Sequence, residues 1–329
     1  MKSSLMPPLL GALGALSLVL LPGTGGALAD GKKVAFFDAG PTHPYVAAMN
    51  KAFNARAKEL GLEVTQFDTP YDAALQSQQI EDAVSRKFDL LAVMGASVSA
   101  IVPALTRAKQ AGIPVVIVNN GIKAGVEDLY VTEVTDDTAK VGRLAAEATI
   151  RAVKESDRTN AKVALITGSL TEGVAKVRLD AFNGIIKEHP EIKVVATEDA
   201  YWDAAKSESI AAQLFARFQP QGGLDVIIGW ADNQTDGIIH AAEAAQIPLG
   251  VGKGKLTVIG TNCTPQTEEN IRSGKQYASA SEPPVRMGSR SAEAVADVLA
   301  GKPQPKHIVL DVDPITKGNF DKYVAGCTY

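Results

Sequence analysis

Short apolar runs in this chain end repeatedly in small, amide or acidic residues. The runs have the composition of strands, and they alternate with stretches in which apolar residues recur at helical spacing. Six runs end in this way: Val34–Phe37, Leu90–Met94, Val115–Val118, Val163–Ile166, Val226–Ile228 and Thr257–Ile259. Strict alternation of strands and helices predicts parallel sheets covered by helices on both faces. Because such sheets bind ligands just past the carboxyl ends of their strands, the polar residues there mark a candidate binding site.

The same pattern predicts further strands and the helices between them. The additional strands are expected at Val64–Phe67, Val194–Thr197, Tyr277–Ser281 and Ile308–Val312. About a dozen strands in all is more than one doubly wound sheet usually holds, so we expect two lobes of about 140–150 residues each. The lobes are expected to divide near Val134–Asp137, where the apolar content falls. No low-complexity linker separates them, which favours short crossovers.

The first 29 residues are predicted to be a secretory signal peptide. Lys2 is followed by the apolar stretch Leu9–Leu21 and by the small-x-small site Ala27-Leu28-Ala29. The stretch is shorter than the ~20 residues of a spanning helix. A buried core helix is the alternative, and the prolines and glycines argue against it. We therefore expect cleavage after Ala29 and localisation in the periplasm.

Composition and charge narrow the function further. The chain has 329 residues, of which 46% are hydrophobic and 21% charged, so it can bury a sizeable core. The formal net charge of −4 argues against a nucleic-acid partner, which would require a basic face. In an exported protein the two cysteines, Cys263 and Cys327, are expected to form a disulfide, with two buried thiols as the alternative.

Motifs for catalysis, metals and cofactors are not found in the sequence. No Gly-x-Ser-x-Gly elbow is present, and the four histidines are scattered, so no enzyme is predicted. No metal site is predicted because no His or further Cys lies at ligand spacing. The glycine-containing stretch Val251–Lys255 precedes a strand instead of linking a strand to a helix, so no phosphate-bearing cofactor is predicted.

The candidate chemistry is a set of polar and aromatic residues after successive strands. Asn119, Asn120, Asp232 and Asn262 can hydrogen-bond a hydroxyl-rich ligand. Trp202 offers a flat apolar face for a sugar ring, and Tyr45 is a possible counterpart. Each residue alone is more simply a turn or cap residue. Their recurrence after one strand after another favours a ligand site.

The chain resembles type I periplasmic substrate-binding proteins of sugar-type ABC importers, the ribose-binding-protein-like cluster. The resemblance covers residues 33 to about 312, and its motifs are Thr42–Tyr45, Ala111–Asn120, Lys176–Gly184, Trp230–Gln234, Val258–Pro265 and Ala280–Pro284. It implies an α/β fold of two Rossmann-like lobes with parallel sheets, joined by three crossovers around a ligand cleft. The N-terminal lobe would comprise residues 31–136 and 283–309, and the C-terminal lobe residues 137–282 and 310–329.

The resemblance also implies which residues bind the ligand. Tyr45, with Thr42 and His43 near it, and Trp202 match ring-stacking positions, and Lys176 or Arg178 matches an arginine that grips hydroxyls. The other positions depart from the ribose pattern, which argues against ribose itself. They are Asn119, where Asp is usual; Asn120, where many have Arg; Asp232, where Asn is usual; Asn262, where Asp is usual; and Glu282, at a Gln position.

The charges refine the expected ligand, and the resemblance implies the mechanism. A doubly anionic ligand would face Asp232 and Glu282, which is costly in a closed cleft. A neutral sugar or polyol is expected, with an amine-bearing ligand as the alternative. The resemblance implies a monomer that closes about its hinge and delivers ligand to an inner-membrane ABC permease. A sensor that passes ligand to a receptor is the other alternative, and the export signal argues against a transcription regulator.

Overall fold

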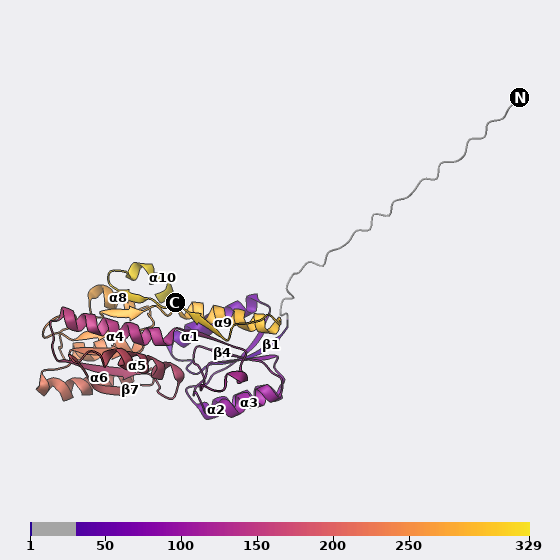
Figure 1. The fold of residues 1–329 in the computed structure, drawn as a ribbon, viewed down its shortest axis with the longest axis horizontal. Coiled ribbons are helices and arrows are strands. Elements are labelled where there is room, and N and C mark those ends of the chain that lie inside the picture. The colour runs from indigo at the N-terminus through magenta and orange to yellow at the C-terminus, as the bar shows by residue number, and fades with distance from the viewer. Residues whose placement is uncertain (2–30) are drawn as a thin grey trace.

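The computed structural model describes Met1 and residues 31–329. The predicted signal peptide, apart from Met1, and its cleavage point therefore lie outside the described residues. The described chain forms two α/β lobes that lie side by side in Figure 1, each built on a six-stranded sheet. None of its described helices is long and apolar enough to cross a membrane.

The first lobe contains the N-terminal strands and one pair of helices on each face. Its strands follow the order β11-β5-β4-β3-β1-β2 and are all parallel. They span β1 Lys33–Phe37, β2 Glu63–Phe67, β3 Leu90–Val93, β4 Val115–Val118, β5 Thr132–Asp136 and β11 His307–Leu310. Helices α1 (Pro44–Glu59) and α9 (Pro284–Leu299) cover one face, and α2 (Ala73–Ser85) and α3 (Val102–Gln110) cover the other (Figure 1).

The sequence of a strand determines which of its side chains pack on each face of the sheet. In β1, Val34 and Phe36 pack with α1 and α9, whereas Ala35 and Phe37 pack with α2 and α3. Alternate side chains of a strand point to opposite faces, so a strand buried on both faces must be apolar throughout. This explains why the central strands were recognisable as continuous apolar runs.

The second lobe repeats this design. Its strands follow the order β12-β10-β9-β8-β6-β7 and span β6 Ala161–Thr167, β7 Ile192–Asp199, β8 Val226–Gly229, β9 Thr257–Ile259, β10 Ala278–Ala280 and β12 Pro314–Thr316. Helices α4 (Thr138–Glu155) and α5 (Gly173–Ile186) cover one face, and α6 (Ala204–Phe218) and α7 (Asp232–Ala244) cover the other. The short helices α8 (Thr267–Ser273) and α10 (Val324–Cys327) lie together beyond β12. The described chain also has 3₁₀ turns at Gln219–Gln221 and Phe320–Lys322 in this lobe and at Glu127–Leu129 in the first lobe.

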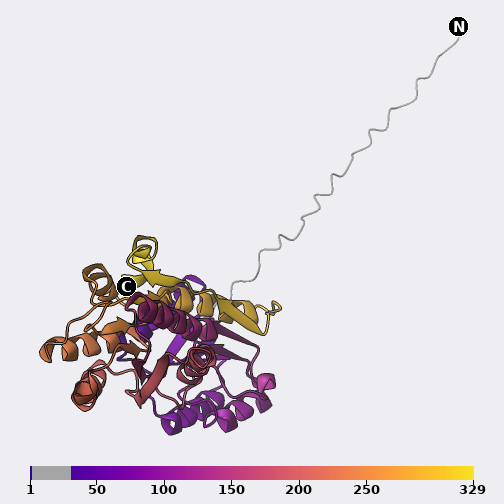
Figure 2. The ribbon, with the colours of Figure 1, turned by 60° about the vertical axis from the view of Figure 1, so that its left-hand side comes forward.

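Three crossovers join the lobes, as the family resemblance implied. The chain passes from β5 to α4, from β10 to α9, and from β11 to β12. The third crossover is hydrogen-bonded to the other two, because Asp137 N donates to Leu310 O (3.0 Å) and Ser281 N donates to Asp313 O (2.9 Å). Figure 2 shows the yellow C-terminal segments along the top of the molecule, beside the gold helix α9. The predicted two-lobed α/β fold is confirmed.

Two strands differ from the sequence prediction. Strand β5 alternates between buried and half-buried residues, so it resembled a loss of apolar content. The predicted strand Ile308–Val312 instead ends at Leu310, which pairs with Asp136 in the first sheet although residue 310 was expected in the second lobe. The chain then crosses to form β12, which runs antiparallel to β10, so the second sheet is not wholly parallel.

Candidate ligand-binding site

A cavity lies between the two lobes, past the carboxyl ends of their strands. Its lining residues come from both lobes and from the second crossover: His43, Tyr45, Val46, Met94, Asn119, Asn120, Glu172, Val174, Arg178, Trp202, Asn262 and Glu282. The space that they enclose is about 30 Å³. By the same measure one water molecule needs about 10–15 Å³, so the cavity has room for about two water molecules. The lobes are therefore closed upon each other, and a ligand of sugar size can enter only when they part.

The cavity brings together most of the residues predicted from sequence, and it leaves three of them outside. Three of the predicted residues, Thr42, Lys176 and Asp232, do not line it. The eight that do are His43, Tyr45, Asn119, Asn120, Arg178, Trp202, Asn262 and Glu282. Thr42 is exposed to solvent. The Lys176 ammonium is also exposed and pairs with Asp180 at 2.6 Å. Contact with ligand stays a prediction for the eight that line the cavity.

His43 presents a free hydrogen-bond donor from the start of α1. It is the N-cap residue of that helix, and its Nδ1 accepts from the backbone N of Tyr45 at 3.2 Å. Burial lowers the pKa of His43 to about 4, so the ring is neutral and its proton lies on Nε2. Within the described chain, buried Nε2 has no partner. The Asn233 side chain, whose Oδ1 also has no partner among the described residues, lies near enough to His43 to act on its pKa. A ligand oxygen is the other group that can satisfy Nε2.

Two asparagines follow β4 at the floor of the first lobe. Asn119 has φ of +59°, a left-handed conformation that asparagine tolerates better than most residues. Asn120 is buried, and its Nδ2 donates to Gly95 O (3.1 Å) and to Glu172 Oε2 (2.8 Å). Since Glu172 belongs to the second lobe, the latter bond joins the lobes across the cleft.

Glu172 is a central residue of the site that the sequence did not reveal. It precedes α5, is buried, and accepts from Trp202 Nε1 on Oε1 at 2.8 Å. Burial raises the pKa of Glu172 to about 8, although its hydrogen bonds with Trp202 and Asn120 oppose the rise. The only available signal was its position a few residues after the apolar run Val163–Ile166, because no motif distinguishes it there.

Trp202 is held in an unusual backbone conformation against a glycine. Its φ is +64°, and the preceding Tyr201 also has a positive φ of +52°. The indole lies directly over Gly168, where an added Cβ would be 1.9 Å from Trp202 Cε2. The guanidinium of Arg178 is 5.7 Å from the ring centroid. Glycine at position 168 is therefore required for the ring to face the cavity.

Arg178, and not Lys176, is the basic residue of the cleft. Its Nη1 donates to Trp230 O (2.7 Å) and to Thr261 Oγ1 (3.0 Å), and its Nη2 forms a buried ion pair with Glu282. Burial raises the pKa of Glu282, while the charge of Arg178 acts in the opposite direction. Arg178 Nε and Glu282 Oε2 have no partner among the described residues, so each can still bond a ligand.

A third buried carboxyl group, that of Asp136, lies at the first crossover, next to the cavity. Tyr45 donates its hydroxyl to Asp136 Oδ2 at 3.2 Å. Burial and the nearby charge of Glu282 raise the pKa of Asp136 to about 8. Sequence analysis missed Asp136 because it missed strand β5. No group of three His, Cys, Asp or Glu side chains within the described chain could hold a metal ion.

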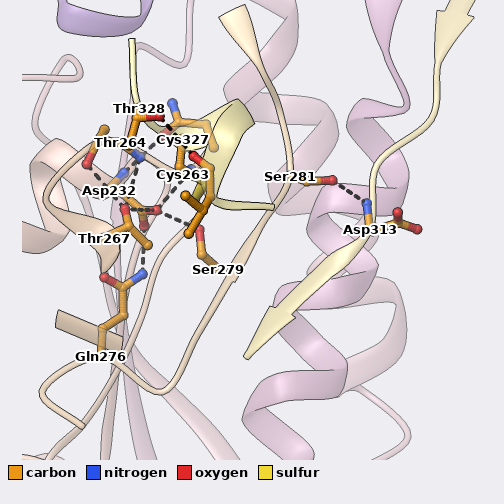
Figure 3. Close-up of a disulfide and its surroundings, with 12 residues drawn as sticks. Asp232, Cys263, Thr264, Thr267, Gln276, Ser279, Ser281, Asp313, Cys327 and Thr328 are labelled. Carbon is orange, nitrogen blue, oxygen red and sulfur yellow. Dashed lines mark hydrogen bonds between the residues drawn. A yellow bond between two sulfur atoms is a disulfide. The ribbon is translucent and has the colours of Figure 1, made fainter. Parts of the chain in front are cut away.

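Asp232 supports the loop that carries Asn262, and Figure 3 shows the side chains around its carboxylate. Its two oxygens accept from four donors: Gln276 Nε2 (2.8 Å), Cys263 N (3.0 Å), Thr267 Oγ1 (2.7 Å) and Ser279 Oγ (2.6 Å). Its backbone N donates to Asn262 Oδ1 at 3.2 Å. Asp232 therefore fixes the loop that carries Asn262, and its carboxylate is not free for a ligand.

The structure contains the expected disulfide, which secures the same loop. Cys263 and Cys327 are bonded, with their Cα atoms 5.0 Å apart, and Figure 3 places the bridge beside Asp232. Asn262 and Cys263 both have positive φ values, +70° and +52°. Conformations of this kind persist where the surroundings hold them. The Asp232 hydrogen bonds and the disulfide supply that constraint next to the cavity.

The fold has two lobes joined by three crossovers, and the cavity between them carries free donors and acceptors. This is the architecture of a solute-binding protein. Comparison with known families agrees. Residues 34–303 match the family described as the periplasmic binding protein domain, and the chain belongs to that family.

Curated relatives and solved structures match over most of the chain. The ribose import binding protein of Bacillus subtilis is 25% identical over 81% of this chain and 81% of its own. The D-allose-binding periplasmic protein of Escherichia coli is 26% identical over 83% and 85%. Among solved structures, a galactofuranose binding protein superposes with a TM-score of 0.83 at 19% identity, covering 90% of this chain and 98% of its own. An Agrobacterium vitis ABC transporter solute-binding protein with bound D-fucose gives 0.82 at 23% identity, covering 90% and 100%.

Proposed function

We propose that this protein is the exported, periplasmic component of an ABC importer and binds a neutral sugar or polyol. The observation that carries the proposal is the pairing of free donors with a free acceptor around the cavity. His43 Nε2 and Arg178 Nε can donate, and Glu282 Oε2 can accept. A hydroxyl group both donates and accepts, so a polyhydroxyl ligand can satisfy both kinds of group at once.

The aromatic and uncharged parts of the lining support a ring-shaped or chain-like polyol. Trp202 provides a flat face for ligand C–H groups, and Val46, Met94 and Val174 provide apolar contact. Asn119 and Asn262 add amides that can bond hydroxyls in either sense. The names of the ribose and D-allose binding relatives agree with this ligand class. A missing hydroxyl would leave buried polar groups unpaired, which gives such a site its selectivity.

The carboxylates of the site favour a second candidate, an amine-bearing ligand. Glu172, Glu282 and the adjacent Asp136 are all buried, and Arg178 is the one basic side chain that lines the cavity. A cationic group would favour the ionised form of these carboxyl groups and would be balanced by their charge. The same excess makes phosphorylated sugars and dicarboxylates poor ligands, because like charges would be brought together in a low-dielectric site.

Closure follows from the position of the ligand between the lobes. A ligand that touches Trp202 on one lobe and Asn119 on the other binds the closed form better than the open form and so shifts the equilibrium toward it. We infer that the protein acts as a monomer, performs no chemistry on its ligand, and presents the closed form to a permease. A sensory role would use the same closure with a receptor as the partner.

The test is a thermal-shift screen of the mature chain against D-ribose, D-allose, D-fucose and myo-inositol, with choline and spermidine as the amine arm. Calorimetry then measures the affinity of each hit, and small-angle scattering measures compaction on binding. We expect a sugar or polyol to bind and to reduce the radius of gyration. Binding of an amine alone would replace the first candidate by the second. Turnover of a bound compound would contradict the binding-protein assignment.

Export is tested separately. Expression of the full chain in a Gram-negative host should place the protein in the periplasmic fraction, with Asp30 as its first residue by N-terminal sequencing. An uncleaved protein in the cytoplasmic fraction would contradict the proposed export.

A further inference from the structure

The segment that precedes α5 crosses the cleft and contacts the first lobe directly. Val98 N, in the loop after β3, donates to Thr171 O at 3.2 Å. A Cβ built at Gly173 would lie 3.4 Å from Gly121 O and 3.4 Å from Val98 Cγ1. Residues 171–173 therefore meet two loops of the first lobe at close range, away from the three crossovers.

Glu172 lies at the centre of this contact and bonds both lobes with one carboxylate. Its Oε2 accepts from Asn120 Nδ2 of the first lobe at 2.8 Å, and its Oε1 accepts from Trp202 Nε1 of the second lobe at 2.8 Å. The side chain is buried, so both bonds are shielded from water. Above its raised pKa of about 8 the group is an ionised carboxylate, whose bonds to N–H donors are among the stronger hydrogen bonds in proteins.

We propose that Glu172 is a positioning residue that couples closure of the lobes to the orientation of the Trp202 ring. When the lobes part, Asn120 moves away with the first lobe and one oxygen of Glu172 loses its partner. The remaining bond and the packing over Gly168 then hold the indole, and the Glu172 carboxyl group that fixes the ring is itself held at both oxygens only in the closed form. The role of the ring in holding ligand rests on the proposed function, whereas the bond across the cleft does not.

Among the side chains of glutamate, glutamine and alanine, only the carboxyl group of glutamate offers one acceptor oxygen to Asn120 and another to Trp202. Glutamine has one acceptor oxygen and a donor amide, so it can accept from Asn120 or from Trp202, and it opposes the other donor with its own N–H groups. Alanine makes neither bond and leaves two buried donors unpaired. Glutamine therefore removes one of the two hydrogen bonds and alanine removes both, so the effect of alanine should be the larger.

The test measures closure without ligand in the full mature chain, with the native disulfide intact. Val98→Cys and Gly173→Cys introduce the sole pair of free thiols, since the two native cysteines are bonded to each other. The Gly173 Cβ position and Val98 Cγ1 are 3.4 Å apart only across the closed cleft. The rate of disulfide formation with oxidised glutathione therefore reports sampling of the closed form, even when that form is rare. Labelling rates of the single-cysteine variants correct for thiol reactivity.

We expect Glu172→Ala to lower the bridging rate about tenfold, the effect of losing one buried hydrogen bond across the cleft. Asn120→Ala should lower it similarly, and the double variant should add little, because both changes remove the same bond. Glu188→Ala is the matched control: this glutamate is exposed on the same lobe and should leave the rate unchanged. An unchanged rate in Glu172→Ala, or strict additivity with Asn120→Ala, would overturn the proposal.

A spectroscopic readout tests the second half of the proposal. The chain has two tryptophans, so a Trp230→Phe background makes Trp202 the only one. Glu172→Ala should increase acrylamide quenching of Trp202, and Glu172→Gln should lie between it and the parent. If Glu172→Ala fails to fold by circular dichroism, Glu172→Gln decides the matter, and quenching and bridging equal to the parent would refute the coupling. Neither readout needs a ligand, so a failed sugar screen and a failed coupling are separate results.

Discussion

Replacement of Arg178 by methionine tests the charge balance on which the site depends. Methionine retains the length and apolar stem of the side chain but removes the ion pair with buried Glu282 and the bonds to Trp230 O and Thr261 Oγ1. Trp230 O keeps a partner, since Thr261 Oγ1 also donates to it at 2.7 Å. The main loss is therefore the partner of Glu282. Removing one partner of a buried ion pair costs about 3–5 kcal/mol, and we expect Arg178→Met to lower the free energy of unfolding by that amount.

The pH dependence of this loss has a definite sign. The pKa of Glu282 is already raised by burial, and the charge of Arg178 also holds down the pKa values of Asp136 and Glu172. Without Arg178 all three values rise further. A carboxyl with a raised pKa in the folded state binds protons more tightly than in the unfolded state, so its contribution to stability falls as the pH rises from its unfolded pKa through its folded pKa. The destabilisation should be small near about pH 5 and larger near about pH 8.

Urea denaturation followed by circular dichroism measures this effect for both proteins at each pH. Adding Glu282→Gln to Arg178→Met should recover most of the loss, because it removes the uncompensated carboxylate, and should leave about 1–2 kcal/mol for the other lost hydrogen bonds. Equal destabilisation at low and high pH, or no recovery in the double variant, would refute this explanation of the Arg178–Glu282 pair.

Three further changes test the binding face and its support. Trp202→Ala should weaken the best-binding sugar of the screen at least about thirtyfold by calorimetry, as for a buried aromatic contact, and unchanged affinity would remove Trp202 from the site. Gly168→Ala should displace the indole of Trp202 and weaken sugar binding. Gly184→Ala is the control, because Gly184 has open space around it and the change should leave the affinity unaltered. Equal affinities of the two variants would contradict the close packing of the ring on Gly168. Replacing Cys263 and Cys327 by alanine opens a loop with a sequence separation of 64 residues and should lower the free energy of unfolding by about 4 kcal/mol in urea melts, so equal midpoints would contradict a stabilising bridge.

The two-lobed α/β architecture could be predicted from the sequence because most strands and helices have a local pattern of apolar residues. Strands such as β1 and β4 are buried on both faces and appear as continuous apolar runs. Strand β5 did not, because its residues alternate between buried and half-buried positions and include Glu133 and Asp136. Strand β12 has three residues, too few for a periodic pattern. Both strands owe their structure to pairing with distant segments, β11 and β10, which no local window contains.

The sequence also determined which loops form the site, since residues after successive parallel strands must meet at one edge of a sheet. The direction of each side chain was decided by the tertiary structure. Lys176 and Arg178 are two residues apart on α5, so they point about 200° apart around the helix, and packing against Glu282 selects Arg178 for the cleft. Glu172 acquires its role only when Asn120, 52 residues away, and Trp202, 30 residues away, are brought to its two oxygens. The linear chain specifies strand ends, whereas only the closed fold specifies which of their side chains share buried hydrogen bonds.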